Sequence, residues 1–235
     1  MKLNRLIKKG LLITVACCLA VPGFADEQED DSKFIVVIGA PASGKSVNSE
    51  LLQKAYDIPW INVREELMKE IKKESKRNRS TASTQHKRGA ASSKRKNAMK
   101  EAVAKLEAGE LVSGDTLNAL IASEFLSSIA KDGFILDGYP MTVEQAEFLD
   151  SLLELRDMSP LKVIYLDIPD EVALQRMKER GREDDKRDIG RERLRVFNSM
   201  IGPLKEYYAD SALVEIDATK GKAAISSEII GALEN

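Results

Sequence analysis

The stretch "FIVVIGAPASGKS" (residues 34–46) joins an apolar run to a loop with the spacing G-x-x-x-x-G-K-S. Its fixed positions are Gly39, Gly44, Lys45 and Ser46. In this pattern the glycines allow tight turns, backbone N–H groups surround a phosphate, the lysine adds a full charge and the hydroxyl reaches a magnesium ion. "SVNSELLQKAY" follows with a helical pattern. The stretch therefore predicts a strand, a phosphate-binding loop and a helix, whereas a glycine-rich turn that holds nothing would not need the lysine or the buried strand.

The rest of the chain alternates apolar runs with helical patterns. Five short runs rich in β-branched residues are expected to be strands, at 34–39, 60–63, 133–137, 162–168 and 213–218. Helices are expected between them, for instance at 142–155, 169–180 and 191–208, and the first of these begins with the capping-box spacing of Thr142 and Gln145. This order predicts an α/β fold with a doubly wound, parallel, five-stranded sheet that binds ligands at the carboxyl ends of its strands.

Composition limits the chemistry that this chain can perform. The 235 residues are 43% hydrophobic and 31% charged with a net charge of −2, which fits one soluble domain and gives no general affinity for nucleic acid or membranes. His86 is the only histidine, and both cysteines, Cys17 and Cys18, lie near the N-terminus. Histidine acid–base chemistry, His/Cys metal sites and disulfides are therefore not expected.

The N-terminus has the pattern of a bacterial secretory signal peptide over residues 1–25. Four basic residues precede the apolar run "GLLITVACCLAVPGF", and Gly23 and Ala25 are small residues before a possible cut at Asp26. The run is too short for a stable membrane span, so we expect an exported, periplasmic protein that begins with an acidic leader at 26–33. A mitochondrial presequence, an uncleaved anchor, a lipoprotein and a cytoplasmic location are the alternatives.

One basic segment does not fit the expected core. Residues 72–96 contain no Leu, Ile, Val or aromatic residue, and Lys69–Lys100 holds 12 Lys and Arg against two Glu. Such a segment cannot bury apolar area, so it is expected to be an exposed insertion, with disorder as one interpretation. It also lacks aromatic side chains for stacking on bases, which disfavours a specific nucleic-acid partner.

Two further constellations support phosphate chemistry. Asp137 ends the predicted strand in "GFILDGYP" and could hold magnesium near the loop, although a turn or cap aspartate is the simpler interpretation of it alone. Seven arginines lie between Arg176 and Arg195, where Asp184 and Asp185 could orient them. A solvated helix face is the plain alternative, but phosphoryl transfer depends on cations around the migrating group.

Together these motifs resemble the adenylate kinase family of nucleoside monophosphate (NMP) kinases, from about Phe34 to the C-terminus. The resemblance rests on "GAPASGKS" (39–46), "DGYPMTVEQA" (137–146), "GELVSGDTLNALI" (109–121), "RGREDD" (180–185), "RERLRVF" (191–197) and "PLKEYY" (203–208). It implies a core over 34–235, an NMP-binding segment at about 60–112 that contains the insertion, and a short lid at about 177–190 without a four-cysteine zinc site. It further implies ATP as phosphoryl donor, Mg²⁺, a nucleotide acceptor and a monomer.

The resemblance assigns site residues by position. ATP would contact Gly39, Ala42, Ser43, Gly44, Lys45, Ser46, Val47, Arg176 and the backbone near Lys220, and the metal would be held by Ser46 and Asp137. The transferring phosphoryl group would be surrounded by Lys45, Arg180, Arg182 and Arg193. The monophosphate would contact Val63, Met68, Leu111, Val112, Gly138, Met141, Gln145, Arg182 and Arg193.

Two of these positions depart from the family pattern. Met141 in "GYPMT" and Met68 in "NVREELM" stand where the family has the arginines that grip the acceptor's phosphate, and Val63 stands at the usual threonine. Each lost contact would cost roughly 1.5–3 kcal/mol of binding free energy for the acceptor. Arg64 or basic residues of the insertion could compensate for this loss. The sequence therefore favours an ATP-dependent NMP kinase, with AMP as the default acceptor and activity that could be reduced. The alternative is an exported, catalytically impaired nucleotide-binding protein of the same fold.

Overall fold

A computed structural model describes residues 33–80, 97–98, 100–102, 104–105, 108, 110, 112–126, 133–155, 158, 162–182 and 185–234. All of them belong to one compact unit, Ser32–Asn235. The predicted signal peptide and all of the acidic leader except Lys33 lie outside the described residues. In the described part of the chain, no helix combines the length and the apolarity that crossing a bilayer requires.

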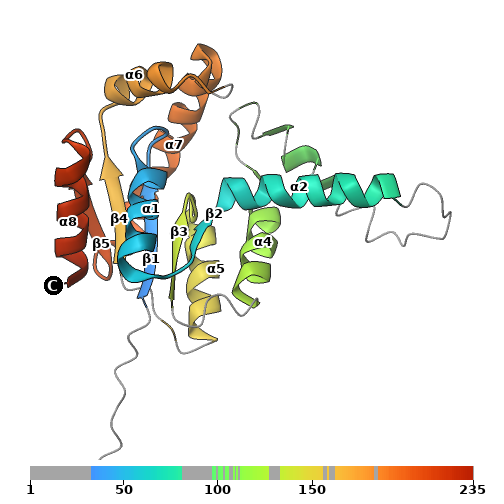
Figure 1. The fold of residues 1–235 in the computed structure, drawn as a ribbon, viewed down its shortest axis with the longest axis horizontal. Coiled ribbons are helices and arrows are strands. Elements are labelled where there is room, and N and C mark those ends of the chain that lie inside the picture. The colour runs from blue at the N-terminus through green and yellow to red at the C-terminus, as the bar shows by residue number, and fades with distance from the viewer. Residues whose placement is uncertain are drawn as a thin grey trace, which may run out of the picture. The chain divides into compact units, whose positions relative to one another are not determined.

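The core of the unit is a five-stranded parallel sheet with the strand order β2-β3-β1-β4-β5 (Figure 1). Its strands are β1 (Lys33–Gly39), β2 (Trp60–Asn62), β3 (Gly133–Asp137), β4 (Lys162–Asp167) and β5 (Leu213–Asp217). The prediction of a doubly wound α/β fold with five parallel strands is thus confirmed, with strand ends shifted by one residue at most. The run 34–38 is at most 3% exposed, as expected for a central strand covered on both faces.

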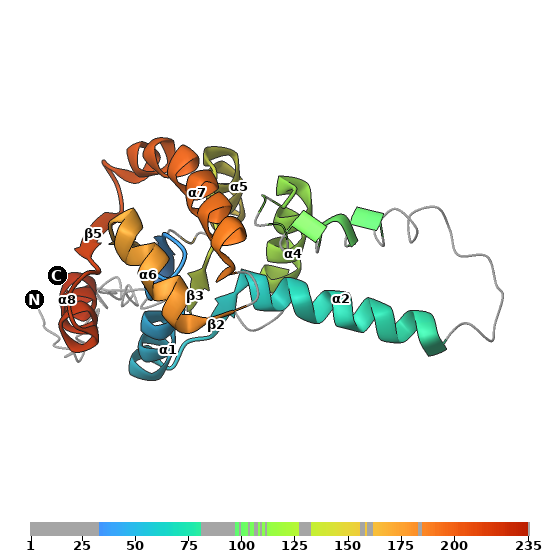
Figure 2. The same ribbon diagram turned by 90° about the horizontal axis from the view of Figure 1, so that it is seen from above.

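Helices cover both faces of the sheet. They are α1 (Lys45–Tyr56), α2 (Val63–Ser80), α4 (Gly114–Leu126), α5 (Val143–Glu154), α6 (Asp170–Arg180), α7 (Arg187–Tyr208) and α8 (Lys222–Glu234). Helices α1 and α8 pack together on one face, and α5 and α7 pack together on the other (Figure 2). Thr142 caps α5 as predicted, because its hydroxyl accepts a hydrogen bond of 3.3 Å from the Gln145 amide.

Strand register brings the carboxyl ends of the strands into one row. Asp137 pairs with Val37 on one side and with Asn62 on the other, and Gly39 pairs with Leu166. Gly39 has φ 155°, and a Cβ there would lie 2.8 Å from the Leu166 carbonyl oxygen. Only glycine therefore lets the chain leave β1 and enter the loop at this point.

Helix α2 was not predicted from the sequence, and it extends into the segment that was expected to be an exposed insertion. Val63 and Leu67 are buried and Ile71 is half-buried, so one face of its first half packs on the protein. Residues 72–80, assigned to the exposed insertion, continue the same helix, and Lys72 and Lys73 are exposed as expected. Lysine and arginine are good helix formers, and the Lys69–Glu66 and Lys73–Glu70 pairs stabilise the turns. Residues 72–80 therefore continue the helix although this segment has no large apolar side chain to bury. Residues 81–96 of the insertion lie outside the described part.

Candidate functional site

The phosphate loop is built by left-handed backbone turns between β1 and α1. Gly44 has φ 102° and Ala42 has φ 63°, and the Ser43 amide donates to the Ala40 carbonyl at 3.1 Å. The amides in the first turn of α1 have no partners within the helix, and they open toward the carboxyl edge of the sheet. The Ser43 hydroxyl is buried without a hydrogen-bond partner among the described residues. This geometry suits a bound anion.

Lys45 leans back over the loop. Its Nζ donates to the carbonyl oxygens of Gly39 at 2.8 Å and Ala40 at 3.0 Å. Burial, with further repulsion from Arg193 and Arg180, lowers the pKa of Lys45 to about 8, although the nearby Asp137 carboxylate opposes this shift. An anionic phosphate would replace the two weak carbonyl partners and would raise the pKa again.

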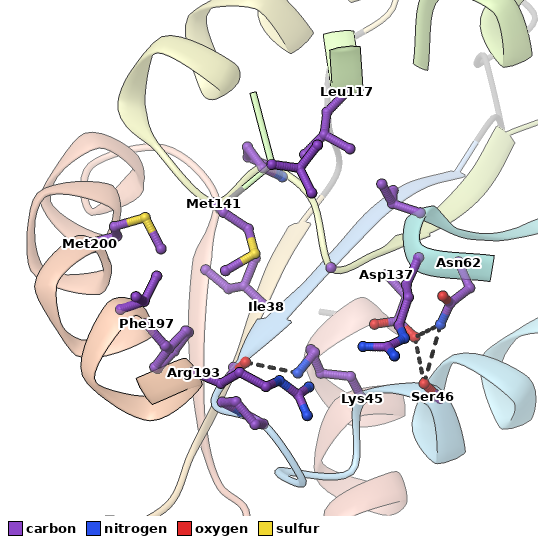
Figure 3. A pocket seen from close by; sticks show the side chains of 18 of the residues that line it. Ile38, Lys45, Ser46, Asn62, Leu117, Asp137, Met141, Arg193, Phe197 and Met200 are labelled. Atoms are coloured by element: carbon purple, nitrogen blue, oxygen red, sulfur yellow. Dashed lines mark hydrogen bonds between the residues drawn. The ribbon is translucent and has the colours of Figure 1, made fainter. Parts of the chain in front are cut away.

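Three polar side chains from separate elements meet at the start of α1. Ser46 Oγ donates to Asp137 Oδ2 at 2.8 Å, and Asn62 Nδ2 donates to the same oxygen at 2.8 Å (Figure 3). Asp137 is 3% exposed, and burial raises its pKa, while Lys45, Ser46 and Asn62 act in the opposite direction. Asn62 was not predicted from the sequence, and its place at the end of the strand expected at 60–63 was the signal that could have found it.

This donor set fits magnesium. Mg²⁺ prefers oxygen ligands and is commonly held by one or two protein groups together with phosphates and water. Ser46 and Asp137 offer one hydroxyl and one carboxylate directly beside the loop. In the described part of the chain, no set of three or more His, Cys, Asp or Glu side chains is arranged to bind a metal by itself. Ser46 and Asp137 would thus supply two ligands to such an ion.

A buried aspartate organises the arginine cluster. Asp185 receives Arg180 Nε at 2.8 Å and NH2 at 2.7 Å, Arg193 NH1 at 3.2 Å and the Arg182 amide at 3.3 Å. Its side chain is 1% exposed. Burial by itself would raise the pKa of Asp185, but Arg180, the Arg182 amide and Arg193 outweigh it and hold the pKa below its ordinary value. The predicted pairing of Asp185 with the cluster is confirmed, whereas Asp184 lies outside the described residues.

Most of the predicted site residues line one cavity of about 340 Å³ at the carboxyl edge of the sheet. They are Gly39, Ala42, Lys45, Ser46, Val63, Val112, Asp137, Gly138, Met141, Arg180, Arg182 and Arg193. Ser43, Gly44 and Val47 belong to the loop or α1 but do not line the cavity. Leu111 lies outside the described residues. The cavity thus brings the loop lysine, the candidate metal ligands and three arginines together.

The far end of this cavity is apolar. Met141 points into it beside Phe197 and Met200 of α7 (Figure 3), and the wall continues with Val196, Ile201 and Leu204. These α7 side chains were not predicted as part of the site, because their sequence pattern indicates only a helix that packs on the sheet. Met141 is therefore placed among apolar neighbours, as its side chain requires.

The other departure from the family pattern is placed differently. Met68 is half-buried on α2 and is not among the residues that line the cavity, although the resemblance predicted contact with the acceptor. Val63 at the start of the same helix does line it. Leu67, one position before Met68, lines the cavity as well, so the part of α2 that forms the cavity wall ends at Leu67.

Two remaining sets of predicted residues lie outside the main cavity. Gln145 is 2% exposed, and its Oε1 accepts a 2.7 Å bond from the Met141 amide; it lines a second pocket, shared with Val112, Asn118 and Thr142. Arg176 NH2 donates to the Ala218 carbonyl at 2.9 Å, which places it beside the turn that contains Lys220. The predicted monophosphate contact Gln145 and the predicted ATP contact Arg176 thus lie on separate sides of the phosphate loop.

Comparison with known proteins agrees with this geometry. The family model for adenylate kinase matches residues 82–213, which is more than half of the chain. The adenylate kinase of Mycolicibacterium vanbaalenii is 34% identical over 184 residues, covering 78% of this chain and 90% of that protein. The adenylate kinase of Mycobacterium tuberculosis is 33% identical with the same coverage. The chain therefore belongs to the adenylate kinase family of nucleoside monophosphate kinases.

Proposed function

We propose that this protein transfers the γ-phosphoryl group of ATP to a nucleoside monophosphate, with AMP as the default acceptor. The observation that carries this proposal is that Lys45 lines one cavity together with Arg180, Arg182 and Arg193. The buried Asp185 fixes two of these arginines, Arg180 and Arg193. A protein that only binds a nucleotide has no use for cations held at the point where a phosphoryl group would migrate. Together with family membership, this favours catalysis.

Phosphoryl transfer depends mainly on the positioning of the two nucleotides and on positive charge around the migrating group. Lys45 would exchange its bonds to the Gly39 and Ala40 carbonyls for the β- and γ-phosphates of ATP. Arg180, Arg182 and Arg193 would face the charge that spreads over the migrating group. An oxygen of the acceptor's phosphate attacks the γ-phosphorus in line, the bond to the β-phosphate oxygen breaks, and ADP leaves. Because the acceptor oxygen is already ionised, no general base is required.

Magnesium would complete the donor site. Ser46 and Asp137 would hold it, and when bound it neutralises charge on the phosphates of ATP. Asn62 would keep the Asp137 carboxylate oriented, since its amide donates to Oδ2 at 2.8 Å. The connection between α6 and α7, with Arg182 and Asp185, is the proposed short lid that would exclude water from the phosphates.

A second candidate is an exported nucleotide-binding protein with impaired catalysis. The apolar end of the cavity, formed by Met141, Phe197 and Met200, supports it, because a monophosphate dianion gains nothing from those side chains. The secretory pattern of residues 1–25 supports it as well, since ATP is scarce outside the cytoplasm. We propose export on that pattern alone.

One assay separates the two candidates. Purified protein is incubated with Mg²⁺, ATP and each of AMP, GMP, CMP and UMP, and all nucleotides are quantified by chromatography. A kinase forms ADP together with the diphosphate of its acceptor, in equal amounts, and Lys45→Met abolishes both. ATP binding by calorimetry without any diphosphate product would refute the kinase proposal and support the binding protein.

A further inference from the structure

The cations that line the main cavity belong to different elements of the fold. Lys45 belongs to the loop and α1, while Arg180, Arg182 and Arg193 belong to α6, α7 and their connection. Among the described residues that line the cavity, Arg64 is the one cation supplied by α2. Its side chain is half-buried, and it is the second residue of that helix.

Position within α2 relates Arg64 to Met68. The two residues are four apart, so they lie on the same face of the helix, one turn from each other. Side chains on a helix lean toward its N-terminus, which for α2 is the end that follows β2 and adjoins the phosphate loop. Arg64 lines the cavity and Met68 does not. On this face of α2, position 64 therefore belongs to the cavity wall and position 68 does not.

Negative charges near Arg64 increase the need for a cation at this wall of the cavity. Glu65 and Glu110 line the same cavity, and both would repel a phosphate dianion. Arg180 and Arg193 both contact one carboxylate, Asp185, which fixes them on the α6–α7 side of the cavity. Asn62, two residues before Arg64, contacts Asp137 and Ser46 at the candidate metal site, which fixes the start of α2 against the donor side.

We propose that Arg64 binds the phosphate of the acceptor monophosphate from the α2 wall, in place of the arginines expected at positions 68 and 141. This inference rests on the proposed kinase function and names a residue that its acceptor site uses. The guanidinium can hold two phosphate oxygens at once, and the N-terminus of α2 adds favourable potential for an anion. The acceptor's phosphate is thus held between Arg64 on one wall and Arg182 and Arg193 on the other.

The test compares variants of Arg64 in both binding and turnover. Arg64→Met should weaken AMP affinity, measured by calorimetry, by roughly 10- to 100-fold and raise the KM for AMP correspondingly, with the KM for ATP unchanged. Arg64→Lys should keep part of the affinity, because charge remains but the two-point contact is lost. Arg195→Met is the matched control, since Arg195 is 70% exposed on α7, pairs with Glu192 and does not line the cavity.

The outcomes distinguish this inference from the kinase proposal. If the wild-type protein forms ADP from AMP and Arg64→Met has the same AMP affinity and KM, the role of Arg64 is wrong and the kinase function stands. If the wild type binds AMP without transfer, and Arg64→Met binds it more weakly, the role of Arg64 in binding stands and the kinase function is wrong. Absence of binding and transfer with all four monophosphates would overturn both.

Discussion

Ser46 and Asp137 are joined by a 2.8 Å hydrogen bond although 91 residues separate them in sequence. The contact exists because β3 lies directly beside β1, so the end of β3 meets the helix that follows the phosphate loop. The two side chains assigned to magnesium thus share one location before any ion is considered. Several measurable consequences depend on this arrangement and on its neighbours.

Replacing Lys45 should abolish tight ATP binding. Lys45→Met removes the charge that would meet the β- and γ-phosphates, and ATP affinity measured by calorimetry should fall at least 100-fold, with the fold retained by circular dichroism. Lys54→Met is the control, because Lys54 lies on the same helix and pairs with Glu50 at the surface. Equal ATP affinity in Lys45→Met and Lys54→Met would contradict the assignment.

ATP affinity should also depend on pH in a defined direction. The pKa of Lys45 is about 8 in the nucleotide-free protein, and bound phosphates favour its charged form. Below that pH the lysine is already protonated, so affinity is constant; above it, binding must take up a proton, and the Kd rises by up to about tenfold per pH unit. Calorimetry in buffers of different ionisation enthalpy should detect this uptake.

The control for this profile is Lys45→Arg. Arginine stays charged throughout the range, so whatever the absolute affinity of the variant, its Kd should not rise between about pH 7.5 and 9.5. A wild-type Kd that is also constant over that range would show that Lys45 does not have the lowered pKa.

Asp185→Asn should reduce turnover more than substrate binding. The carboxylate fixes Arg180 and Arg193, so its loss lets both arginines move, and kcat should fall by roughly 10- to 100-fold. The unfolding free energy at pH 7 should fall by about 1–3 kcal/mol, as expected when hydrogen bonds to a charged group are lost. Glu192→Gln, which disrupts an exposed pair with Arg195, should change neither quantity appreciably.

The pH dependence of that stability loss has a fixed sign. The pKa of Asp185 is lowered in the folded state, so its contribution is present above the ordinary carboxyl pKa and disappears as pH falls through the folded value. The difference in unfolding free energy between wild type and Asp185→Asn should therefore shrink in acid. A difference that grows in acid, in urea titrations, would show that the carboxylate is not stabilised by its arginines.

The two methionines should respond differently to the same substitution. Met141 lines the cavity, so Met141→Arg should tighten AMP binding by about tenfold or more if the new contact is worth at least 1.5 kcal/mol. Met68 does not line it, so Met68→Arg serves as the matched comparison and should have a smaller effect. A larger gain from Met68→Arg, measured by calorimetry, would mean that α2 approaches the acceptor more closely than the structure places it.

The predicted cleavage after residue 25 can be tested by mass spectrometry of the intact protein. If residues 1–25 are a secretory signal, the intact protein from its native host should begin at or near Asp26 and be found in an exported fraction. Soluble cytoplasmic protein that retains Met1 would refute export. This result bears on the source of ATP and not on the assignment of the cavity.

Local patterns were sufficient to predict the sheet and the loop. The strand and loop at 34–46 follow from an apolar run and fixed glycines, and the arginine–aspartate pairing follows from their proximity in sequence around Asp185. Such features need only residues close together along the chain. The resemblance then implied the activity, because the phosphate loop, the motif at 137–146 and the arginine-rich connection together match one family.

Features that depend on packing could not be read in the same way. Asn62 reaches Asp137 only because β2 pairs with β3 in one register, and Phe197 and Met200 line the cavity only because α7 crosses that end of the sheet. Whether Arg64 or Met68 lines the cavity depends on how α2 packs against the protein, and the sequence pattern does not show this packing. The helical residues 72–80 show that charge alone does not exclude a helix.

The close approach of Gly39 to the Leu166 carbonyl has an evolutionary consequence. Because not even a methyl group fits between the loop and β4, any substitution of Gly39 would displace the loop or a central strand. Mutational drift in substrate preference is therefore directed toward the opposite end, where Met141 and Phe197 are side chains that can change size and polarity while the sheet stays intact. Under the proposed function, mutation could therefore change the phosphoryl acceptor more readily than the phosphoryl donor.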